Sequence, residues 1–310
     1  MAETYDIIII GGGAAGFSAG MYAARDGCRT VLLERFSAGG QVLNCEHIEN
    51  YPGFPDGVAG YSLGPLLQQQ AMGFGMQMQL TEVASVRLEG DDRVVVTDAG
   101  ELRARALIVA TGSRFTSLDI PGEEDFAGKG VSHCASCDGA FFIDKPVVVV
   151  GGGDAAVDEG LHLTQYVSQV TLVHRRDTLR ACRALQDRAR QADKLAFRWN
   201  TALRAIEGGE GVERVQLEDL QTGQTSQLEV AGVFIYAGLT PNSGLLDGIV
   251  ALNGNGQIVT DLWMRTAVPG ILAAGDVRGE SSRQLISAAG DGATAALAAV
   301  RYVQTGEWAG

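Results

Sequence analysis

Two cysteines with ionisable neighbours form the densest cluster of reactive side chains in this sequence. Residues 130–139 read GVSHCASCDG, so Cys134 and Cys137 have Cys-x-x-Cys spacing, with His133 before them and Asp138 after them. Such a segment fits half of a zinc site, a redox-active disulfide, or two thiols with no chemical role. Structural zinc sites take four ligands, and only His133 lies near the pair in sequence. We therefore predict no metal site, and the rest of the chain must decide between the other two interpretations.

Asp138 is the candidate acid/base beside the pair. A working dithiol needs one thiol to ionise near neutral pH, although a free cysteine has a pKa of about 8.5. The sulfur that leaves during thiol–disulfide exchange also needs a proton. Asp138 adjoins Cys137 and can supply or accept that proton. The alternative role, as a helix cap or turn residue before Gly139, is compatible with the first.

A dinucleotide-binding pattern occupies the N-terminal region. The run Ile7–Ile10 is continuously apolar, as in strands that are buried on both faces. It enters Gly11-x-Gly13-x-x-Gly16, and an Ala-rich helical stretch and a second strand ending at Glu34 follow. The first glycine permits the tight turn, the second lets the backbone approach a pyrophosphate, and the third lets the helix pack on the strand. Glu34 stands where a carboxylate accepts hydrogen bonds from a ribose, so the complete pattern favours a nucleotide site over a chance glycine turn.

The same pattern returns later in the chain. Val147–Val150 and Gln169–Val173 are the expected strands, and Gly151-x-Gly153-x-x-Ala156 is the turn that follows the first of them. The second copy matches the first with a constant shift of 140 residues. The chain therefore contains two nucleotide-binding units of one kind.

The residues at the ribose position distinguish the two units. With this shift Glu34 falls on His174, which is followed by Arg175, Arg176 and, further on, Arg180. A carboxylate repels a 2′-phosphate, whereas guanidinium groups bind one through charge-assisted hydrogen bonds. The alternative is that the arginines belong to a solvated helix start. We favour phosphate recognition, so that the first unit fits FAD and the second fits NADPH, an ordinary pair for electron transfer.

A β-rich segment follows each nucleotide-binding unit. Residues 78–113 alternate apolar and polar side chains and turn near Gly90 and Gly100, and residues 195–242 are similar. This alternation predicts antiparallel strands with one exposed face. The chain therefore holds two related domains.

A late segment indicates that the second domain is inserted into the first. The predicted strand Ile271–Ala274 runs into Gly275, and a helix is expected to begin near Gly290 or Gly292. If this segment completes the first domain, the linkers are Pro121-Gly122 and Thr240-Pro241-Asn242, which together make a hinge. The predicted fold class is α/β, with two Rossmann-like FAD/NAD(P)-binding domains. The expected domains are an FAD-binding domain at 1–117 and 243–310, and an NADPH-binding domain at 118–242 that carries the cysteine pair.

Composition restricts the class of protein further. The 310 residues are 46% hydrophobic and carry a formal charge of −13, which argues against binding to nucleic acid or an anionic membrane. No apolar run approaches the about 20 residues of a membrane span, and the acidic N-terminus does not resemble a secretory signal. Five scattered cysteines are unlike a secreted disulfide scaffold. We expect a cytoplasmic protein in which an oxidised pair is catalytic rather than structural.

The motifs, taken in order, resemble those of low-molecular-weight thioredoxin reductases of the bacterial type, class II of the pyridine nucleotide-disulfide oxidoreductases. They are GGGAAG, GGQVLNCEHIENYPGF, ATGS, CASCDG, GGGDAAVDEG, HRRDTLRA, GILAAGDV and RQLISAAGDG, and they span essentially the whole chain. The resemblance implies that electrons pass from NADPH through FAD and a Cys134–Cys137 disulfide to a thioredoxin-like protein disulfide, with Asp138 as acid/base. It also implies a homodimer, and rotation of the NADPH domain between half-reactions, which the inserted topology fits.

The resemblance also assigns binding residues. Gln41 and Asn50 would line the flavin, and Asp276 would bind the ribityl chain. The implied FAD residues are Gly11, Gly13, Ala14, Ala15, Gly16, Glu34, Arg35, Gly40, Gln41, Asn50, Val83, Thr111, Gly112, Gly275, Asp276, Arg283 and Gln284. The implied NADPH residues are Gly153, Asp154, Ala155, Ala156, His174, Arg175, Arg176 and Arg180.

Several residues depart from the usual family pattern. Ala155, Gly160, Leu179 and Cys182 replace more customary residues of the second unit, which puts the NADPH affinity in question. Cys45 falls in the flavin segment, where we interpret it as a small apolar filler.

Three other functions share part of the pattern. They are a flavin-dependent dithiol oxidase, a ferredoxin-linked thioredoxin reductase of the same fold, and a flavin-bound redox sensor without turnover. The arginine cluster argues against the oxidase, because that class needs no site for a 2′-phosphate. The sequence leaves the partner's identity open, and it leaves two interpretations for Trp308, a frayed end or a cover for a partner's flavin.

Overall fold

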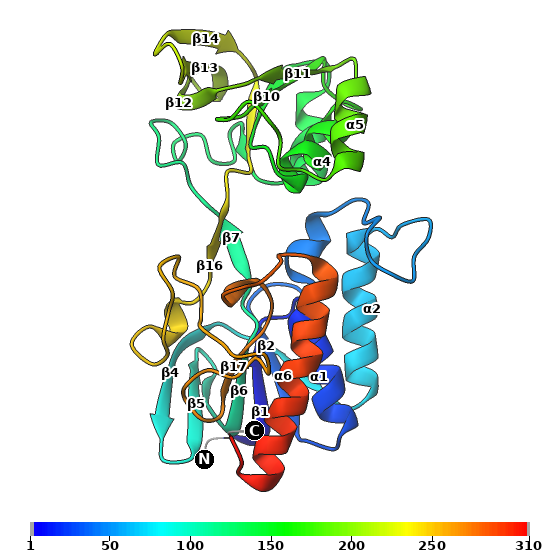
Figure 1. The fold of residues 1–310 in the computed structure, drawn as a ribbon, viewed down its shortest axis with the longest axis vertical. Helices are drawn as coiled ribbons and strands as arrows, with labels where there is room; N and C mark the ends of the chain where they lie inside the picture. Colours follow the sequence, from blue (N-terminus) through cyan, green and yellow to red (C-terminus); the bar gives the residue numbers. More distant parts are fainter. Residues whose placement is uncertain (1–2, 309–310) are drawn as a thin grey trace. The chain divides into compact units, whose positions relative to one another are not determined.

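The computed structural model describes residues 3–308 and forms two compact units (Figure 1). The first unit comprises residues 1–114 and 240–310, and the second, residues 115–239, is inserted into it. The chain passes between the units through the short strands β7 (Ser113–Phe115) and β16 (Leu239–Pro241), which pair with each other. The sequence placed these boundaries slightly later, after residues 117 and 242.

One of the two expected linkers lies elsewhere. Thr240-Pro241-Asn242 coincides with the second crossing, but Pro121 and Gly122 lie inside the second unit. The carbonyl of Pro121 accepts a 2.9 Å hydrogen bond from the backbone of Ile206. Gly122 has φ +85°, and a Cβ there would collide with the Ile206 carbonyl. This Pro-Gly pair therefore marks a close packing contact of the second unit and not a linker.

A seven-stranded sheet forms the centre of the first unit. Its order is β3-β2-β1-β6-β5-β4, with β17 also paired to β6. The pairs β3–β2, β2–β1, β1–β6 and β6–β17 are parallel, whereas β6–β5 and β5–β4 are antiparallel. The bounds are β1 (Glu3–Ile10), β2 (Thr30–Glu34), β3 (Gln77–Leu80), β4 (Val83–Glu89), β5 (Asp92–Thr97), β6 (Gly100–Val109) and β17 (Ile271–Ala273). The late segment thus completes the first sheet, as the inserted topology requires.

Both faces of this sheet are covered. The helices α1 (Ala14–Arg25), α2 (Gly60–Gly73) and α6 (Leu285–Thr305) lie together on one side, as Figure 1 shows. Ile7 and Ile9 pack into the core under these helices, whereas Ile8 and Ile10 pack into a second core with Leu246. Because alternate side chains of β1 are buried on opposite faces of the sheet, the strand is apolar at every position from residue 7 to residue 10.

The expected start of the last helix was wrong. α6 begins at Leu285, where Gln284 and Ser287 form a capping box, and both Gly290 and Gly292 lie inside the helix. A Cβ on Gly292 would collide with the carbonyl of Ala15 in α1. Glycine therefore serves here to let α1 and α6 approach closely, although in the sequence it resembles a helix boundary.

The second unit repeats the first. Its main sheet has the order β11-β10-β9-β15-β8 and is parallel throughout, so β11, β10, β9 and β15 correspond to β3, β2, β1 and β6. A separate antiparallel sheet of three strands, β12-β13-β14, corresponds to the second β-rich segment. The strand bounds are β8 (Val131–Ser132), β9 (Pro146–Val150), β10 (Gln169–Val173), β11 (Leu195–Arg198), β12 (Thr201–Gly208), β13 (Val212–Asp219), β14 (Thr225–Glu229) and β15 (Gly232–Ile235). The helices are α3 (Ala135–Asp138), α4 (Asp154–Leu163) and α5 (Arg183–Gln191).

The C-terminal tail packs on its own unit. The indole of Trp308 donates a 3.2 Å hydrogen bond to the carbonyl of Thr266 and meets the ring of Tyr302 edge to face at 5.0 Å. The interpretation of Trp308 as a frayed end was therefore wrong. Within residues 3–308, no helix combines the length and apolar character needed to cross a membrane.

Candidate active site and nucleotide-binding turns

Cys134 and Cys137 form a disulfide at the start of α3, with their Cα atoms 5.3 Å apart. Cys134 is the N-cap residue, and its Sγ accepts a 3.2 Å hydrogen bond from the backbone N–H of Cys137. The Ser136 hydroxyl lies 3.4 Å from the same sulfur and donates to it, because a disulfide sulfur carries no hydrogen. Cys137 is exposed and Cys134 is half-buried. The pair is thus accessible, and hydrogen-bond donors already surround one sulfur.

The two neighbours of the pair have different surroundings. Asp138 ends α3 half-buried, and its side chain caps neither α3 nor the following 3₁₀ turn, Gly139–Phe142. Asp138 is thus, as expected, a turn residue before Gly139 at the N-cap position of the 3₁₀ turn, but its side chain makes no capping hydrogen bond there. His133 stacks on Phe115 at 5.5 Å, and its Nδ1 lies 2.8 Å from the carbonyl of Ile235, to which it must donate. In the described part of the chain no three His, Cys, Asp or Glu side chains are grouped so that they could hold a metal ion.

The first glycine turn has the shape that a pyrophosphate needs. Gly11 has φ +108°, and a Cβ there would collide with the carbonyl of Ala110. A Cβ on Gly16 would collide with the carbonyl of Gly11, whereas a Cβ on Gly13 would meet no atom within 4 Å. Gly13 is the N-cap of α1, and no side chain caps that end. The first N–H groups of α1 therefore face open space, which fits a bound anion.

Glu34 is held at the end of β2 by three backbone donors. Its Oε2 accepts from Gly12 at 2.7 Å, and its Oε1 accepts from Arg35 at 2.8 Å and from Phe36 at 3.0 Å. Oε2 keeps a further lone pair for a ribose hydroxyl, whereas both lone pairs of Oε1 already accept backbone hydrogen bonds. Gly40 has φ +60°, and a Cβ added to it would lie 3.3 Å from the Cα of Gly13. The structure thus brings the turn, Glu34 and Gly40 together, with Ala14 and Ala15 in the first turn of α1.

Several of the implied flavin residues make hydrogen bonds within the first unit. The amide of Gln41 donates to the carbonyl of Ser113, directly after Thr111 and Gly112. Asn50 donates to the side chain of Gln284 at 3.2 Å. Thr111 and Asn242 exchange two hydrogen bonds, from the Thr111 hydroxyl at 2.7 Å and from the Asn242 amide at 2.9 Å. Val83 makes none of these contacts. It begins β4 and packs against the core that contains Ile8 and Ile10.

Asp276 is an acidic residue among the implied flavin residues. It follows Gly275 at the end of β17, and burial raises the pKa of its carboxyl, although Ser281 and Arg283 oppose the shift. The Ser281 hydroxyl lies 3.4 Å from Asp276. Gly275 is anchored by Asp291 of α6, whose carboxylate accepts from the Gly275 backbone at 3.1 Å. The GD segment is therefore fixed between the sheet and α6, with one partly desolvated carboxyl beside it.

The second glycine turn is built like the first. Gly151 has φ +152°, Gly153 is the N-cap of α4 without a side-chain cap, and an added Cβ on Gly153 meets no atom within 4 Å. Ala156 is buried under Gly151 where Gly16 lies in the first unit. A Cβ on Gly152 would run into the ring of His174, as one on Gly12 would approach Glu34. The ribose positions of the two units thus correspond.

His174 and its arginines differ in burial. His174 is 5% exposed, and its Nε2 makes no hydrogen bond within the described residues. Burial lowers the pKa of His174, and the charges of Arg180, Arg176 and Arg175 add to this effect, so the ring is neutral at pH 7. The three arginines are exposed, and none of them forms an ion pair within residues 3–308. Three unneutralised guanidinium groups beside a neutral ring suit an anionic ligand group.

The arginines lie on an exposed loop that precedes α5, so the helix starts later than the arginine cluster. α5 begins only at Arg183, after the N-cap Cys182. The backbone N–H groups of Arg180 and Ala181 donate to the carbonyl of Gly152, at 2.6 and 3.1 Å. The carboxylate of Asp154 accepts from the backbone of Cys182 at 2.7 Å. These bonds tie the arginine loop to the glycine turn, while Ala155 stays exposed.

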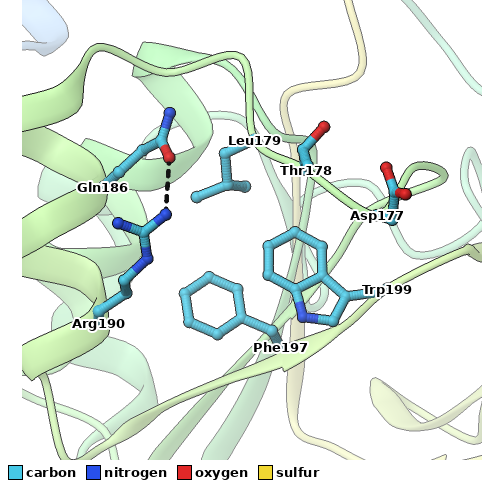
Figure 2. A pocket seen from close by; sticks show the side chains of 7 residues that line it. All are labelled: Asp177, Thr178, Leu179, Gln186, Arg190, Phe197 and Trp199. Carbon is cyan, nitrogen blue, oxygen red and sulfur yellow. Dashed lines mark hydrogen bonds between the residues drawn. The ribbon is translucent and has the colours of Figure 1, made fainter.

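A small cavity of about 100 Å³ lies behind this loop (Figure 2). Figure 2 shows the rings of Phe197 and Trp199 on one side, stacked at 4.8 Å, and Arg190 on the other, where it donates to Gln186 at 3.0 Å. Leu179 contributes to the wall. The residues around it are Asp177, Thr178, Leu179, Gln186, Arg190, Phe197 and Trp199. None of the implied NADPH residues lines this cavity, although residues 177–179 of the arginine loop form part of its wall.

The other departures from the family pattern are structurally mild. Gly160 is buried in α4, and an added Cβ would meet Leu195 at an ordinary 3.5 Å, so an alanine fits there. Cys45 is half-buried and packs against the small apolar cluster of Val42, Ile48 and Leu63, as expected of an apolar filler.

Comparison with known proteins identifies the family. The model of the pyridine nucleotide-disulphide oxidoreductases matches residues 5–293. The chain belongs to this family. Thioredoxin reductase of Treponema pallidum is similar, with 45% identity over 98% of this chain and 99% of its own length. Thioredoxin reductase of Bacillus subtilis has 44% identity over 97% of this chain and 96% of its own length. A crystal structure of Lactococcus lactis thioredoxin reductase, in the FR conformation, has 40% identity and a TM-score of 0.95, and covers 97% of this chain and 99% of that one.

These findings confirm the resemblance seen in the motifs and the fold class. Membership of the pyridine nucleotide-disulphide oxidoreductases implies binding of a flavin and a pyridine nucleotide. The two open glycine turns, one in each unit, are suited to the two dinucleotides. Sequence reasoning missed two residues behind the disulfide, Glu159 and Tyr236, because nothing in the motifs connects them to Cys134.

Proposed function

We propose that the protein is an NADPH-dependent flavoprotein that reduces the disulfide of a thioredoxin-like protein. The observation that carries this proposal is the placement of an accessible disulfide in the same compact unit as a nucleotide turn flanked by unpaired arginines. A dithiol oxidase has no use for those arginines, and a ferredoxin-linked enzyme receives its electrons without NADPH. The proposed function therefore accounts for both features of the second unit.

FAD is the flavin that fits the first unit, and NADPH the nucleotide that fits the second. Glu34 would accept hydrogen bonds from the adenosine ribose of FAD, and the open first turn of α1 would receive its pyrophosphate. Arg175, Arg176 and Arg180 would bind the 2′-phosphate of NADPH at the position where Glu34 stands in the first unit. When bound, FAD supplies a two-electron carrier between the nicotinamide and the disulfide.

The chain's own residues carry out the exchange that follows. Reduction breaks the Cys134–Cys137 bond and takes up two electrons and two protons. One of the two resulting thiols loses its proton and attacks the partner's disulfide as a thiolate, and the other cysteine then attacks the mixed disulfide, which restores Cys134–Cys137 and leaves the partner as a dithiol. Asp138, half-buried beside Cys137, would donate the proton that the leaving sulfur needs. The Cys137 N–H and the Ser136 hydroxyl would stabilise negative charge on the Cys134 sulfur.

We also propose three features that the resemblance implied. The second unit rotates on the paired crossings β7 and β16, so that nucleotide and disulfide reach the flavin in turn. The protein forms a homodimer, for which the exposed apolar side chains Tyr61, Leu66 and Met72 of α2 provide surface. It works in the cytoplasm, where an accessible disulfide is catalytic rather than structural.

Rapid mixing tests the proposed activity. The oxidised flavoprotein is mixed anaerobically with NADPH, and the flavin absorbance should bleach and then recover when an oxidised thioredoxin is added. NADH at the same concentration should bleach the flavin much more slowly. No bleaching with NADPH would contradict the proposal, and recovery with oxygen but not with thioredoxin would indicate the dithiol oxidase instead.

A further inference from the structure

A carboxylate from another helix is bonded to the backbone of the disulfide segment. Glu159 lies in α4, and its Oε2 accepts a 2.9 Å hydrogen bond from the N–H of Ala135, the residue that follows Cys134. Ala135 is fully buried and Glu159 is half-buried. Covalent geometry places the Ala135 nitrogen about 4 Å from the Cys134 sulfur, so the carboxylate lies within about 7 Å of it. A negative charge is therefore held close to the sulfur that the donors of α3 surround.

A buried phenol lies beside this carboxylate. Tyr236 is 7% exposed, and its hydroxyl lies beside the Glu159 carboxylate and the Ala135 backbone. Burial raises the pKa of Tyr236 far above its ordinary value, with a further contribution from the negative charge of Glu159. The Glu159 carboxylate therefore lies next to a buried side chain on the same side of the disulfide segment as Ala135.

The other ionisable groups around α3 are few. Asp138 belongs to α3 itself, and His133 precedes Cys134 with its Nδ1 on the Ile235 carbonyl. α4, which packs against α3, carries Asp154, the exposed Asp158 and the half-buried His162 besides Glu159, and Tyr236 follows β15. Glu159 accepts a hydrogen bond from the backbone next to a redox cysteine, and Asp158 offers a matched exposed carboxylate one residue away.

We propose that Glu159 is a positioning residue that keeps the Cys134–Cys137 dithiol strongly reducing, by disfavouring the thiolate that forms when the disulfide is reduced. The inference rests on the proposed function and deepens it, because it assigns the electron-donating strength of the pair to one side chain. A charge at about 7 Å, with an effective dielectric constant between those of the protein surface and water, changes a thiol–thiolate equilibrium about tenfold. For a two-electron couple, tenfold corresponds to about 30 mV.

The direction follows from the charges. Above the pH at which the first thiol ionises, the reduced pair carries a negative charge, and Glu159 destabilises it relative to the neutral disulfide. Removal of the Glu159 charge should therefore stabilise the reduced pair and make the potential less negative. At lower pH both reduced cysteines are neutral thiols, so the charge of Glu159 has almost no effect on the potential.

The test is a redox titration of the full chain with mixtures of reduced and oxidised dithiothreitol, in which the state of the two cysteines is read by alkylation and mass spectrometry. Glu159→Gln keeps an acceptor for the Ala135 N–H and removes the charge. We expect a midpoint about 30 mV less negative than wild type at pH 9, and no difference at pH 5.5. Alkylation of the reduced pair at pH 7 should also be about three- to fourfold faster in this variant, because the thiolate fraction rises about tenfold while the reactivity of each thiolate falls with its pKa.

Two control variants separate charge from packing. Glu159→Asp keeps the charge and should keep the wild-type potential, and Asp158→Asn removes an exposed charge from the same helix and should shift the midpoint by less than about 10 mV. Equal midpoints for wild type and Glu159→Gln at pH 9, or an equal shift at both pH values, would overturn the inference. Because dithiothreitol replaces both NADPH and thioredoxin, an unshifted potential leaves the proposed activity standing. A failure to reduce thioredoxin, in turn, leaves the potential measurable.

Discussion

The arginine loop of the second unit should determine the preference for NADPH over NADH, and Arg180 is the most informative residue to change. Its backbone N–H bonds to Gly152 in the glycine turn, and its charge is the largest electrostatic contribution to the lowered pKa of His174. The guanidinium therefore lies near the ribose position. A charge-assisted hydrogen bond contributes about 1.5–3 kcal/mol, and exposure of Arg180 to water reduces this to about 1–2 kcal/mol.

Arg180→Gln should therefore lower kcat/KM for NADPH about five- to thirtyfold and change that for NADH less than about twofold. The matched control is Arg183→Gln, because Arg183 is exposed on α5 and already paired with Asp187 at 3.6 Å. The pKa of His174, followed by NMR without any nucleotide, should rise in Arg180→Gln. Equal losses with both nucleotides, or a selectivity that Arg183→Gln alters as strongly, would refute the assignment of a 2′-phosphate site.

Three further predictions concern substitutions of single residues. Asp138→Asn should leave flavin reduction by NADPH unchanged and slow turnover with thioredoxin about tenfold or more, and equal coupled rates would remove Asp138 from the mechanism. Asp276→Asn should raise the melting temperature of the flavin-free protein at pH 7, because the raised pKa of Asp276 means that its charged form opposes folding. This gain should vanish as the pH falls below about 3.9, where both folded and unfolded states are protonated, and a gain that persists there would contradict the argument. In denaturant unfolding, Gly160→Ala should stabilise the chain by up to about 1 kcal/mol, since its Cβ meets Leu195 at 3.5 Å, whereas Gly292→Ala, which collides with a carbonyl of α1, should destabilise it by about 1–3 kcal/mol.

Much of the fold could be predicted because its signals are local. The strands β9 and β10 lie within one residue of the predicted ranges 147–150 and 169–173, since both faces of a parallel sheet are buried and its strands are therefore predominantly apolar. Glycine was less reliable. Gly122 and Gly292 resemble a linker and a helix boundary in the sequence, but both allow close packing against residues far away in the chain.

The candidate site divides in the same way. The equivalence of Glu34 and His174 followed from the spacing of two motifs, and the packing of Gly12 and Gly152 against these side chains agrees with it. The Cys134–Cys137 bond followed from the family resemblance. Glu159 and Tyr236 could not be found, because their positions beside Ala135 depend on how α4 and the strand end after β15 pack against α3. No short-range pattern records that packing.

The central claim is that electrons from NADPH arrive at Cys134 and Cys137 before they leave the protein. The most direct measurement is anaerobic reduction with NADPH, rapid alkylation, and mass analysis of the peptide that carries residues 130–139. The account predicts two new alkylated thiols, at Cys134 and Cys137, that disappear when oxidised thioredoxin is added before the alkylating reagent. A disulfide that stays unlabelled while the flavin is reduced and reoxidised by thioredoxin would contradict it.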